Sequence, residues 1–207
     1  MRQTPIKLKK IAIFSSSEGS NAANLMHYFK NHPSIGVDML VSDRFSSQSL
    51  VKAAAFGVPT FSFSFAKEGF PAHLPFLLKE RGIDLVVLAG YFSLLPICMI
   101  EAFPQKILNI HPSLLPHFGG KGCYGSKLLD KILRSGHTST GITIHFVDEE
   151  YDHGQIVFQK ACEIDHADTV ESLRERMKIL EYQYYPKVVE AIFASAQQEK
   201  FVKDERI

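Results

Sequence analysis

The residues best suited to chemistry lie in one short stretch, Asn109-Ile110-His111-Pro112-Ser113-Leu114-Leu115-Pro116. The apolar run just before it predicts a short strand, and its prolines predict a rigid turn after that strand. Asn109 and His111 are two residues apart, so they face the same side of the strand. An amide can donate to a developing oxyanion, and an imidazole can move a proton near neutral pH. An isolated Asn-x-His is more often a turn residue beside a surface histidine, so a catalytic role needs support from other segments of the chain.

A second candidate site follows the first predicted strand, Ile11–Phe14. The loop after this strand contains Gly19-Ser20-Asn21 and leads into a helix that we expect to end near Lys30. Backbone N–H groups at the start of such a helix can hold a phosphate. The patterns G-x-G-x-x-G and G-x-x-x-x-G-K are absent, which argues against NAD and ATP. An ordinary turn with Ser20 as the N-cap is an equal alternative.

Three further polar groups have both a functional and a structural interpretation. Asp152 ends an acidic run and could hold His111 and raise its pKa, although such a loop is normally solvated. His145 lies on the strand face opposite an Ile-Ile-Phe stripe and, taken alone, is better explained as a structural histidine. Lys178 and Glu181 share one helix face, where a surface ion pair is the simpler alternative.

Apolar runs alternate with helical stretches in the first half of the chain. This pattern predicts an α/β fold with a doubly wound, mostly parallel sheet, Rossmann-like in the N-terminal half and with an antiparallel part in the C-terminal half. The long C-terminal helix contains Pro186, which should kink or divide it. The expected strands are 11–14, 37–41, 60–63, 85–90, a strand from 106, 141–147 and 156–159, and the expected helices are 20–30, 48–56, 70–81, 125–134 and 169–196.

At 207 residues the chain is most economically one domain, 1–207, with exposed tails at 1–9 and 197–207. A net charge of +1 gives no argument for nucleic acid or an anionic membrane surface. No apolar run approaches the ~18 residues that a membrane helix needs, and the run after the basic start is too short for a signal peptide. The three cysteines form no C-x-x-C pair, which favours a reducing cytoplasm and gives no structural zinc site.

Six segments occur in one order and together closely resemble the phosphoribosylglycinamide formyltransferase family. The Asn109–Pro116 block and the pattern H-x-V-x-x-x-x-D-x-G from His145 to Gly154 are typical of formyltransferases that use 10-formyltetrahydrofolate. Gly19-Ser20-Asn21 and the helix around Glu181 point to the branch that acts on glycinamide ribonucleotide. The likeness runs from about residue 10 to about residue 193. The segments are Gly19-Ser20-Asn21, Val87-Leu88-Ala89-Gly90-Tyr91, residues 109–116, residues 141–147, Tyr151-Asp152-His153-Gly154, and Glu181-Tyr182 before Tyr185-Pro186.

The resemblance implies a cytoplasmic enzyme of purine biosynthesis that acts on small molecules, as a monomer or weak homodimer. It implies 10-formyltetrahydrofolate as cosubstrate and no metal. Asn109, His111 and Asp152 match the catalytic trio of the family, and His145 is a candidate supporting residue. Matching positions imply ribonucleotide contacts at Gly19, Ser20, Asn21, Lys178 and Glu181, and folate contacts at Lys67, Phe92, Ser93, Leu94, Leu95, Asn109 and Tyr151.

The chain departs from the family pattern at three places. Ser93 stands where many members carry Arg, so one polar contact to the folate is missing or replaced. The segment 117–125 differs from the commoner P-G-L-H type, and Lys121 within it is a candidate substitute contact. His153 adds a titratable group beside Asp152. None of these departures removes a member of the trio.

The residues and the resemblance together predict attack of the ribonucleotide amine on the formyl carbon. Asn109 and protonated His111 would stabilise the oxyanion, each donor being worth roughly 3–4 kcal/mol. Asp152 would raise the pKa of His111 and accept the proton of the amine, directly or through a water, and His111 would protonate the leaving nitrogen.

Several alternatives remain open at this point. Within the family these are a formyltetrahydrofolate hydrolase and a formyltransferase acting on a different amine. A methionyl-tRNA formyltransferase would need a further basic domain. Outside the family, a histidine metal centre lacks a recognised spacing, and a serine hydrolase at Ser113 lacks G-x-S-x-G. A non-catalytic ligand-binding relative is disfavoured by the intact trio.

Overall fold

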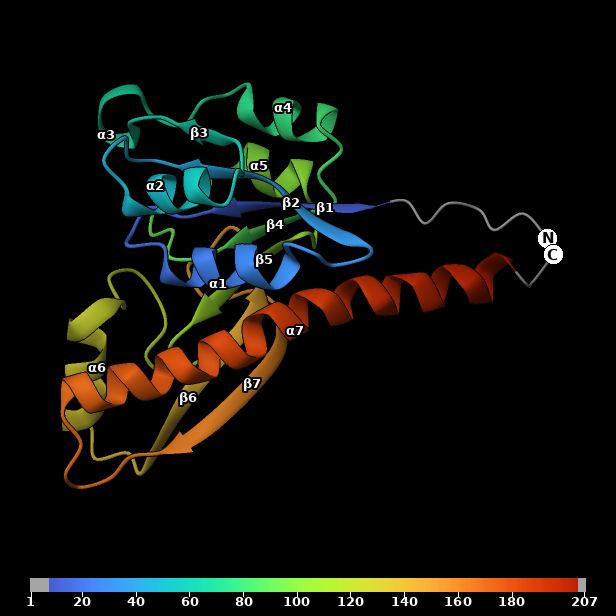
Figure 1. Cartoon of the computed structure of the whole chain (residues 1–207). Helices are drawn as coiled ribbons and strands as arrows, with labels where there is room; N and C mark the ends of the chain where they lie inside the picture. Colours follow the sequence, from blue (N-terminus) through green and yellow to red (C-terminus); the bar gives the residue numbers. More distant parts are fainter. Residues whose placement is uncertain (1–7, 205–207) are drawn as a thin grey trace.

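A computed structural model describes residues 8–204 of the chain (Figure 1). Its centre is one seven-stranded sheet with the strand order β3-β2-β1-β4-β5-β6-β7. The strands from β3 to β5 pair in parallel, whereas β6 is antiparallel to β5 and to β7. The predicted α/β fold and the antiparallel part near the C-terminus are thereby confirmed. The strands are β1 Lys9–Phe14, β2 Ile35–Ser42, β3 Thr60–Ser62, β4 Leu85–Leu88, β5 Ile107–His111, β6 Ser139–Phe146 and β7 Ile156–Glu163.

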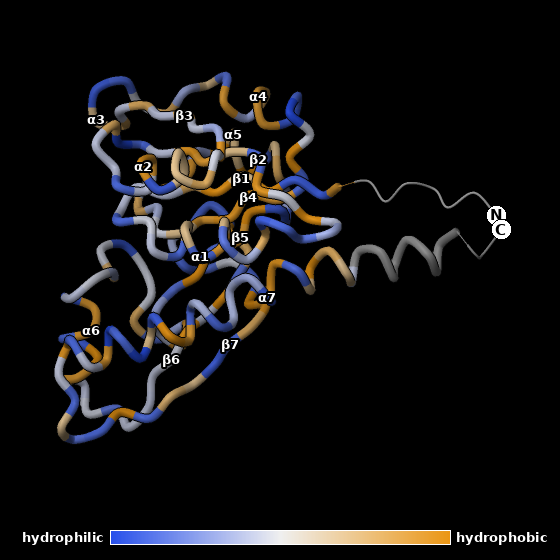
Figure 2. Tube along the Cα trace, viewed as in Figure 1, coloured by the Kyte–Doolittle hydropathy of each residue, from blue (hydrophilic) through white to orange (hydrophobic). Residues whose placement is uncertain are grey.

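Helices cover both faces of the sheet, and each face has its own core. In β1, Ile11 and Ile13 belong to the core that α1, α2, α6 and α7 cover, whereas Ala12 and Phe14 belong to the core that α4 and α5 cover. Strands buried on both faces carry continuous apolar runs, and the hydrophobic segments gather around β1 and β4 in Figure 2. The helices are α1 Ser20–Phe29, α2 Gln48–Ala55, α3 Phe65–Glu68, α4 Leu74–Glu80, α5 Ile97–Ala102, α6 Gly125–Arg134 and α7 Val170–Asp204.

The helix expected at 70–81 was wrong at its start. Pro75 lies in the first turn of α4, where a missing N–H costs nothing, so the helix begins only at Leu74. A separate short helix, α3, precedes it. The structure also contains α5, which the sequence analysis did not predict because its six residues are too few to show a helical period.

The last helix, α7, is continuous through Pro186 rather than divided by it. A proline removes the hydrogen bond to the carbonyl four residues earlier, here that of Tyr182. The Asn24 side-chain amide of α1 donates to this carbonyl at 3.0 Å, so the freed acceptor is satisfied. The helix also continues through residues 197–204 of the expected C-terminal tail, and 205–207 lie outside the described residues. Of the expected N-terminal tail, residue 9 belongs to β1, and 1–7 lie outside the described residues.

Among the described helices, α7 included, none combines the length and apolarity needed to cross a membrane.

Candidate active site

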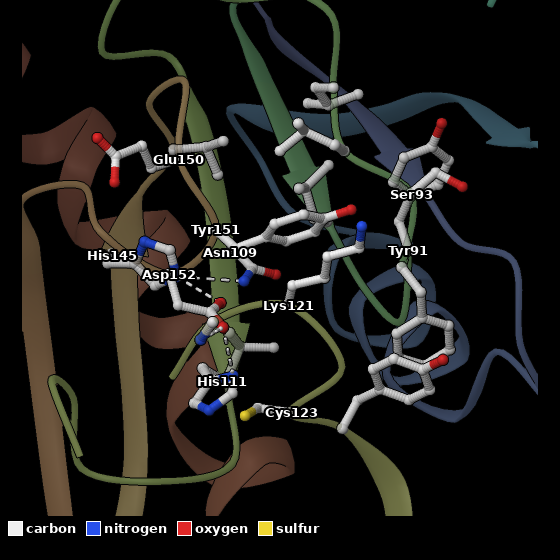
Figure 3. Close-up of a pocket in the computed structure, with 18 of the residues that line it drawn as sticks. Tyr91, Ser93, Asn109, His111, Lys121, Cys123, His145, Glu150, Tyr151 and Asp152 are labelled. Atoms are coloured by element: carbon white, nitrogen blue, oxygen red, sulfur yellow. Dashed lines mark hydrogen bonds and ion pairs between the residues drawn. The ribbon is translucent and has the colours of Figure 1, made fainter. Parts of the chain in front are cut away.

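A pocket of about 300 Å³ opens at the carboxyl ends of β4 and β5 (Figure 3). This is the edge of the sheet at which the strand order reverses between β1 and β4, the usual ligand position in doubly wound folds. The residues after β4 form one wall, the β5 residues form the base, and the loops around Gly120 and Asp152 form the opposite side. Asn109, His111, His145 and Asp152 gather at one end, and Lys121 extends into the space between them and Tyr91.

The wall after β4 is mainly apolar and contains four residues predicted to contact folate: Phe92, Ser93, Leu94 and Leu95. The Phe92 ring stacks on Tyr124 with the ring centroids 4.7 Å apart. The neighbouring Tyr91 is buried, and its hydroxyl has no hydrogen-bond partner within the described part of the chain. Sequence reasoning named neither tyrosine as a site residue.

The base of the pocket brings together groups from two antiparallel strands and a loop. Asn109 on β5 lies opposite His145 on β6, and its Nδ2 is 3.1 Å from Nε2 of His145. His111 Nδ1 is 3.4 Å from Oδ2 of Asp152, and His145 Nε2 is 3.7 Å from Oδ1 of Asp152. The three residues predicted to be catalytic therefore converge, with His145 as a fourth member of the group.

The loop that carries Asp152 is held by backbone constraints. Asp152 has φ 55°, a left-handed conformation that is uncommon outside glycine. A Cβ on Gly154 would lie 2.0 Å from the carbonyl oxygen of Phe146, so only glycine fits this close approach. The Gly120 N–H donates to Asp152 Oδ2 at 2.9 Å, which ties the loop to segment 117–125. The exposed His153 instead contacts the half-buried Asp148, with its Nδ1 at 2.8 Å from Oδ2.

The hydrogen-bond partners of His111 favour a charged imidazole, whereas its burial opposes one. Nε2 is 3.1 Å from the carbonyl oxygen of Phe118, which can only accept, and Nδ1 faces the Asp152 carboxylate. A neutral imidazole carries one N–H and satisfies only one of these acceptors. Burial nevertheless lowers the pKa of His111, and this effect outweighs the upward effect of Asp152. Asp152 thus acts upward on the pKa of His111 as expected, but the net shift of this pKa is downward.

The Asp152 carboxyl has a pKa below its ordinary range. Burial acts upward on this pKa, but the adjacent imidazoles of His145 and His111 and the hydrogen bond from the Gly120 N–H together outweigh burial. Asp152 is therefore ionised at neutral pH, next to a His111 that burial keeps neutral. Such a pair can take up a proton and pass it on.

His145 orients Asn109. Its Nδ1 lies 2.8 Å from the carbonyl oxygen of Phe146 and therefore carries the proton in the neutral tautomer. Nε2 is then the acceptor for Asn109 Nδ2, which leaves the second N–H of that amide free to face the pocket. This contact gives His145 a specific place in the group, where the sequence alone had favoured a structural histidine.

The loop after β1 starts α1 with Gly19 as the N-cap at φ 69°. A Cβ on Gly19 would lie 2.6 Å from the Cβ of Ser49, so the tight packing against α2 also requires glycine. Asn21 donates through Nδ2 to Oε2 of Glu181 at 2.7 Å, and its own Oδ1 is buried without a partner in the described chain. Burial raises the pKa of Glu181. The structure therefore joins two residues predicted to bind the ribonucleotide.

The remaining predicted contacts are more scattered. Lys178 is partly exposed, 3.7 Å from a carboxylate oxygen of Glu175, rather than paired with Glu181. Lys67 on α3 lines a neighbouring hollow that adjoins the pocket at Ser93. The hydroxyl of Ser93 donates to Asp43, a buried carboxylate. Among the described side chains, no group of three His, Cys, Asp or Glu residues is arranged to hold a metal ion.

The chain belongs to the formyl transferase family, whose family model matches residues 9–189. Among curated proteins it is 36% identical over 190 residues to phosphoribosylglycinamide formyltransferase of Bacillus subtilis, a match that covers 89% of this chain and 95% of that protein. It is 42% identical over 191 residues to the chloroplastic phosphoribosylglycinamide formyltransferase of Arabidopsis thaliana, a match that covers 89% of this chain. The chain spans 65% of the length of that plant relative and 62% of the corresponding protein of Vigna unguiculata.

Solved structures give the same result. The phosphoribosylglycinamide formyltransferase of Bacillus halodurans superposes with a TM-score of 0.82 at 32% identity, covering 91% of this chain and 97% of that chain. The glycinamide ribonucleotide transformylase 1 of Geobacillus kaustophilus superposes with a TM-score of 0.82 at 34% identity, covering 89% and 98%.

Proposed function

We propose that this protein transfers the formyl group of 10-formyltetrahydrofolate to the amine of glycinamide ribonucleotide, a step of purine biosynthesis. The observation that carries this proposal is the convergence of Asn109, His111 and Asp152 at the base of one pocket. Membership of the formyl transferase family and the names of the relatives support it.

The pocket suits the proposed cosubstrate. Its wall is apolar at Leu94 and Leu95, which suits the ring system of a folate, and its base supplies polar groups. We assign folate contacts to Phe92–Leu95, Asn109 and Tyr151, and an outer contact to Lys67 in the adjoining hollow.

The ribonucleotide would bind at the loop after β1. The backbone N–H groups at the start of α1, together with Ser20 and Asn21, suit a phosphate. We assign Glu181, which already holds Asn21, to the ribonucleotide, and Lys178 to the rim of the same site.

In the proposed reaction the substrate amine attacks the formyl carbon, a C–N bond forms, and the carbonyl oxygen becomes an oxyanion. The free N–H of Asn109 stabilises this oxyanion. Asp152 accepts the proton that the amine loses and passes it to His111, which is then charged and adds to the stabilisation. His111 then protonates the folate nitrogen as the second C–N bond breaks. One proton enters the pair and one leaves, so Asp152 and His111 return to their starting state.

The burial of His111 fits this sequence of steps. Because burial lowers its pKa, the imidazolium form is a stronger acid than an exposed one and gives up its proton more readily. A neutral His111 is also the state that can receive the proton carried in by Asp152.

A spectroscopic formyl-transfer assay tests the proposal. We expect turnover of 10-formyltetrahydrofolate that requires glycinamide ribonucleotide. Loss of the formyl group at the same rate without any amine would indicate a hydrolase, and faster transfer to another amine would indicate a different acceptor. No turnover under any of these conditions would contradict the proposal.

We further propose that residues 1–207 form one formyltransferase domain that works as a monomer or weak homodimer in the cytoplasm. The single sheet and free thiols at Cys98, Cys123 and Cys162 support these assignments. Sedimentation at several protein concentrations measures the oligomeric state.

A further inference from the structure

A buried tyrosine on α7 connects the last helix to two central strands. Tyr185 has no exposed surface. Its hydroxyl lies 2.8 Å from the carbonyl oxygen of Leu88 and 3.1 Å from that of Leu108. The two carbonyls belong to neighbouring strands, β4 and β5, and the hydroxyl proton can be donated to either of them.

These two carbonyls lie directly before the two parts of the candidate site. Leu88 is the last residue of β4 and leads into the wall that begins with Tyr91. Leu108 immediately precedes Asn109, and Asn109 is the register partner of Leu88 in the sheet. The Tyr185 hydroxyl therefore contacts the backbone of both strands next to the residues that line the pocket.

The same helix, α7, also contacts the segment Gly19-Ser20-Asn21, to which we assign the ribonucleotide. Glu181 lies four residues before Tyr185, about one helical turn, and accepts the hydrogen bond from Asn21. Burial and the nearby Glu181 both raise the pKa of Tyr185, which keeps the phenol protonated and able to donate. One face of α7 thus contacts the loop after β1 and the backbone beneath Asn109.

We propose that Tyr185 is a positioning residue for the formyl transfer proposed above: its hydroxyl fixes the carbonyls of Leu88 and Leu108 and so sets the position of the Asn109 amide relative to the pocket wall. Tyr185 does not touch the reacting atoms. Its effect passes through the backbone of Asn109, and the inference rests on the proposed function.

Kinetics of Tyr185→Phe test the proposal, with Tyr184→Phe as the matched control because the half-buried Tyr184 stacks on Phe158 of β7 and the substitution keeps that ring. Misplacement of a catalytic group commonly costs up to ~100-fold, and we expect Tyr185→Phe to lower kcat about 10-fold per folded molecule. KM for the ribonucleotide should stay within about twofold, because the Glu181 contact remains. The control should leave kcat unchanged.

A double-mutant cycle with Asn109→Ala separates positioning from general destabilisation. If Tyr185 acts through the Asn109 amide, Tyr185→Phe should cause less than about a twofold further loss of kcat in the Asn109→Ala protein. An equal loss in both backgrounds would overturn the proposal.

Amide hydrogen exchange gives a readout that does not depend on turnover. Exchange should become faster at residues 107–111 in Tyr185→Phe and remain unchanged in Tyr184→Phe. Unchanged exchange at 107–111 would overturn the positioning role even if the enzyme is active. If the unmodified protein transfers no formyl group, the proposed function fails, and the exchange experiment still decides whether Tyr185 anchors β5.

Discussion

Replacement of Asp152 by Asn tests the proposed proton transfer most directly. Asn has nearly the same shape, and its carbonyl oxygen can keep the hydrogen bond from the Gly120 N–H, now 2.9 Å from Oδ2. The change removes the charge that faces His111 at 3.4 Å and the base that would accept the amine proton. The perturbation is therefore chemical rather than steric.

The expected magnitude follows from the role. Loss of a positioned general base costs roughly 10²–10⁴-fold in rate, or about 3–5 kcal/mol in the barrier at 1.36 kcal/mol per tenfold. The cost in folding should be smaller. Exchanging a charged acceptor for a neutral one at the Gly120 N–H lowers the free energy of unfolding by about 1 kcal/mol.

Steady-state kinetics and thermal unfolding of Asp152→Asn measure both effects, with Asp148→Asn as the control. Asp148 lies in the same loop but pairs with the exposed His153. We expect kcat to fall at least ~100-fold for Asp152→Asn only, with KM for the ribonucleotide nearly unchanged. Near-normal turnover of Asp152→Asn would refute the assignment of Asp152 as the base.

Three further outcomes are expected. Because burial lowers the pKa of His111, kcat/KM should fall on the acid side through a pKa below the ordinary 6.5. The contribution of neutral His111 to the free energy of unfolding is fully present above pH 6.5 and should be lost as the pH drops below it. The pH profiles of rate and unfolding measure both effects. Gly57→Ala should lower the free energy of unfolding by the ~1–2 kcal/mol of left-handed strain alone, because φ is 70° there and nothing lies within 4 Å. Gly19→Ala should cost more, because its Cβ would also lie 2.6 Å from a side-chain atom of α2. Denaturant titration compares the two variants. Asn24→Ala leaves the Tyr182 carbonyl unpaired and should lower the free energy of unfolding by about 1–3 kcal/mol, measured by denaturant titration. An unchanged free energy of unfolding would mean that water replaces the amide.

The sequence was sufficient where the signal was local or carried by a side chain. Continuous apolar runs located β1 and β4, and alternation located β6. The spacing of Asn109 and His111 correctly placed both on one side of β5, and the resemblance added Asp152.

The sequence was insufficient where the determining contact was distant or came from the backbone. The carbonyl that receives His111 belongs to Phe118, and the N–H that holds Asp152 belongs to Gly120, so no side-chain type marks them. The direction of the His111 pKa depends on burial, which no motif reports. The continuity of α7 through Pro186 depends on an amide from α1, far away in the chain.

The place of α7 in the chain has a consequence for how the molecule is made. Its Glu181 meets a partner 160 residues earlier, and its Tyr185 meets partners 97 and 77 residues earlier. During synthesis the sheet can begin to assemble outside the ribosome, but these contacts must wait until α7 has emerged. Such long-range closure is the slow part of folding, so the candidate site should be among the last of the described regions to become ordered.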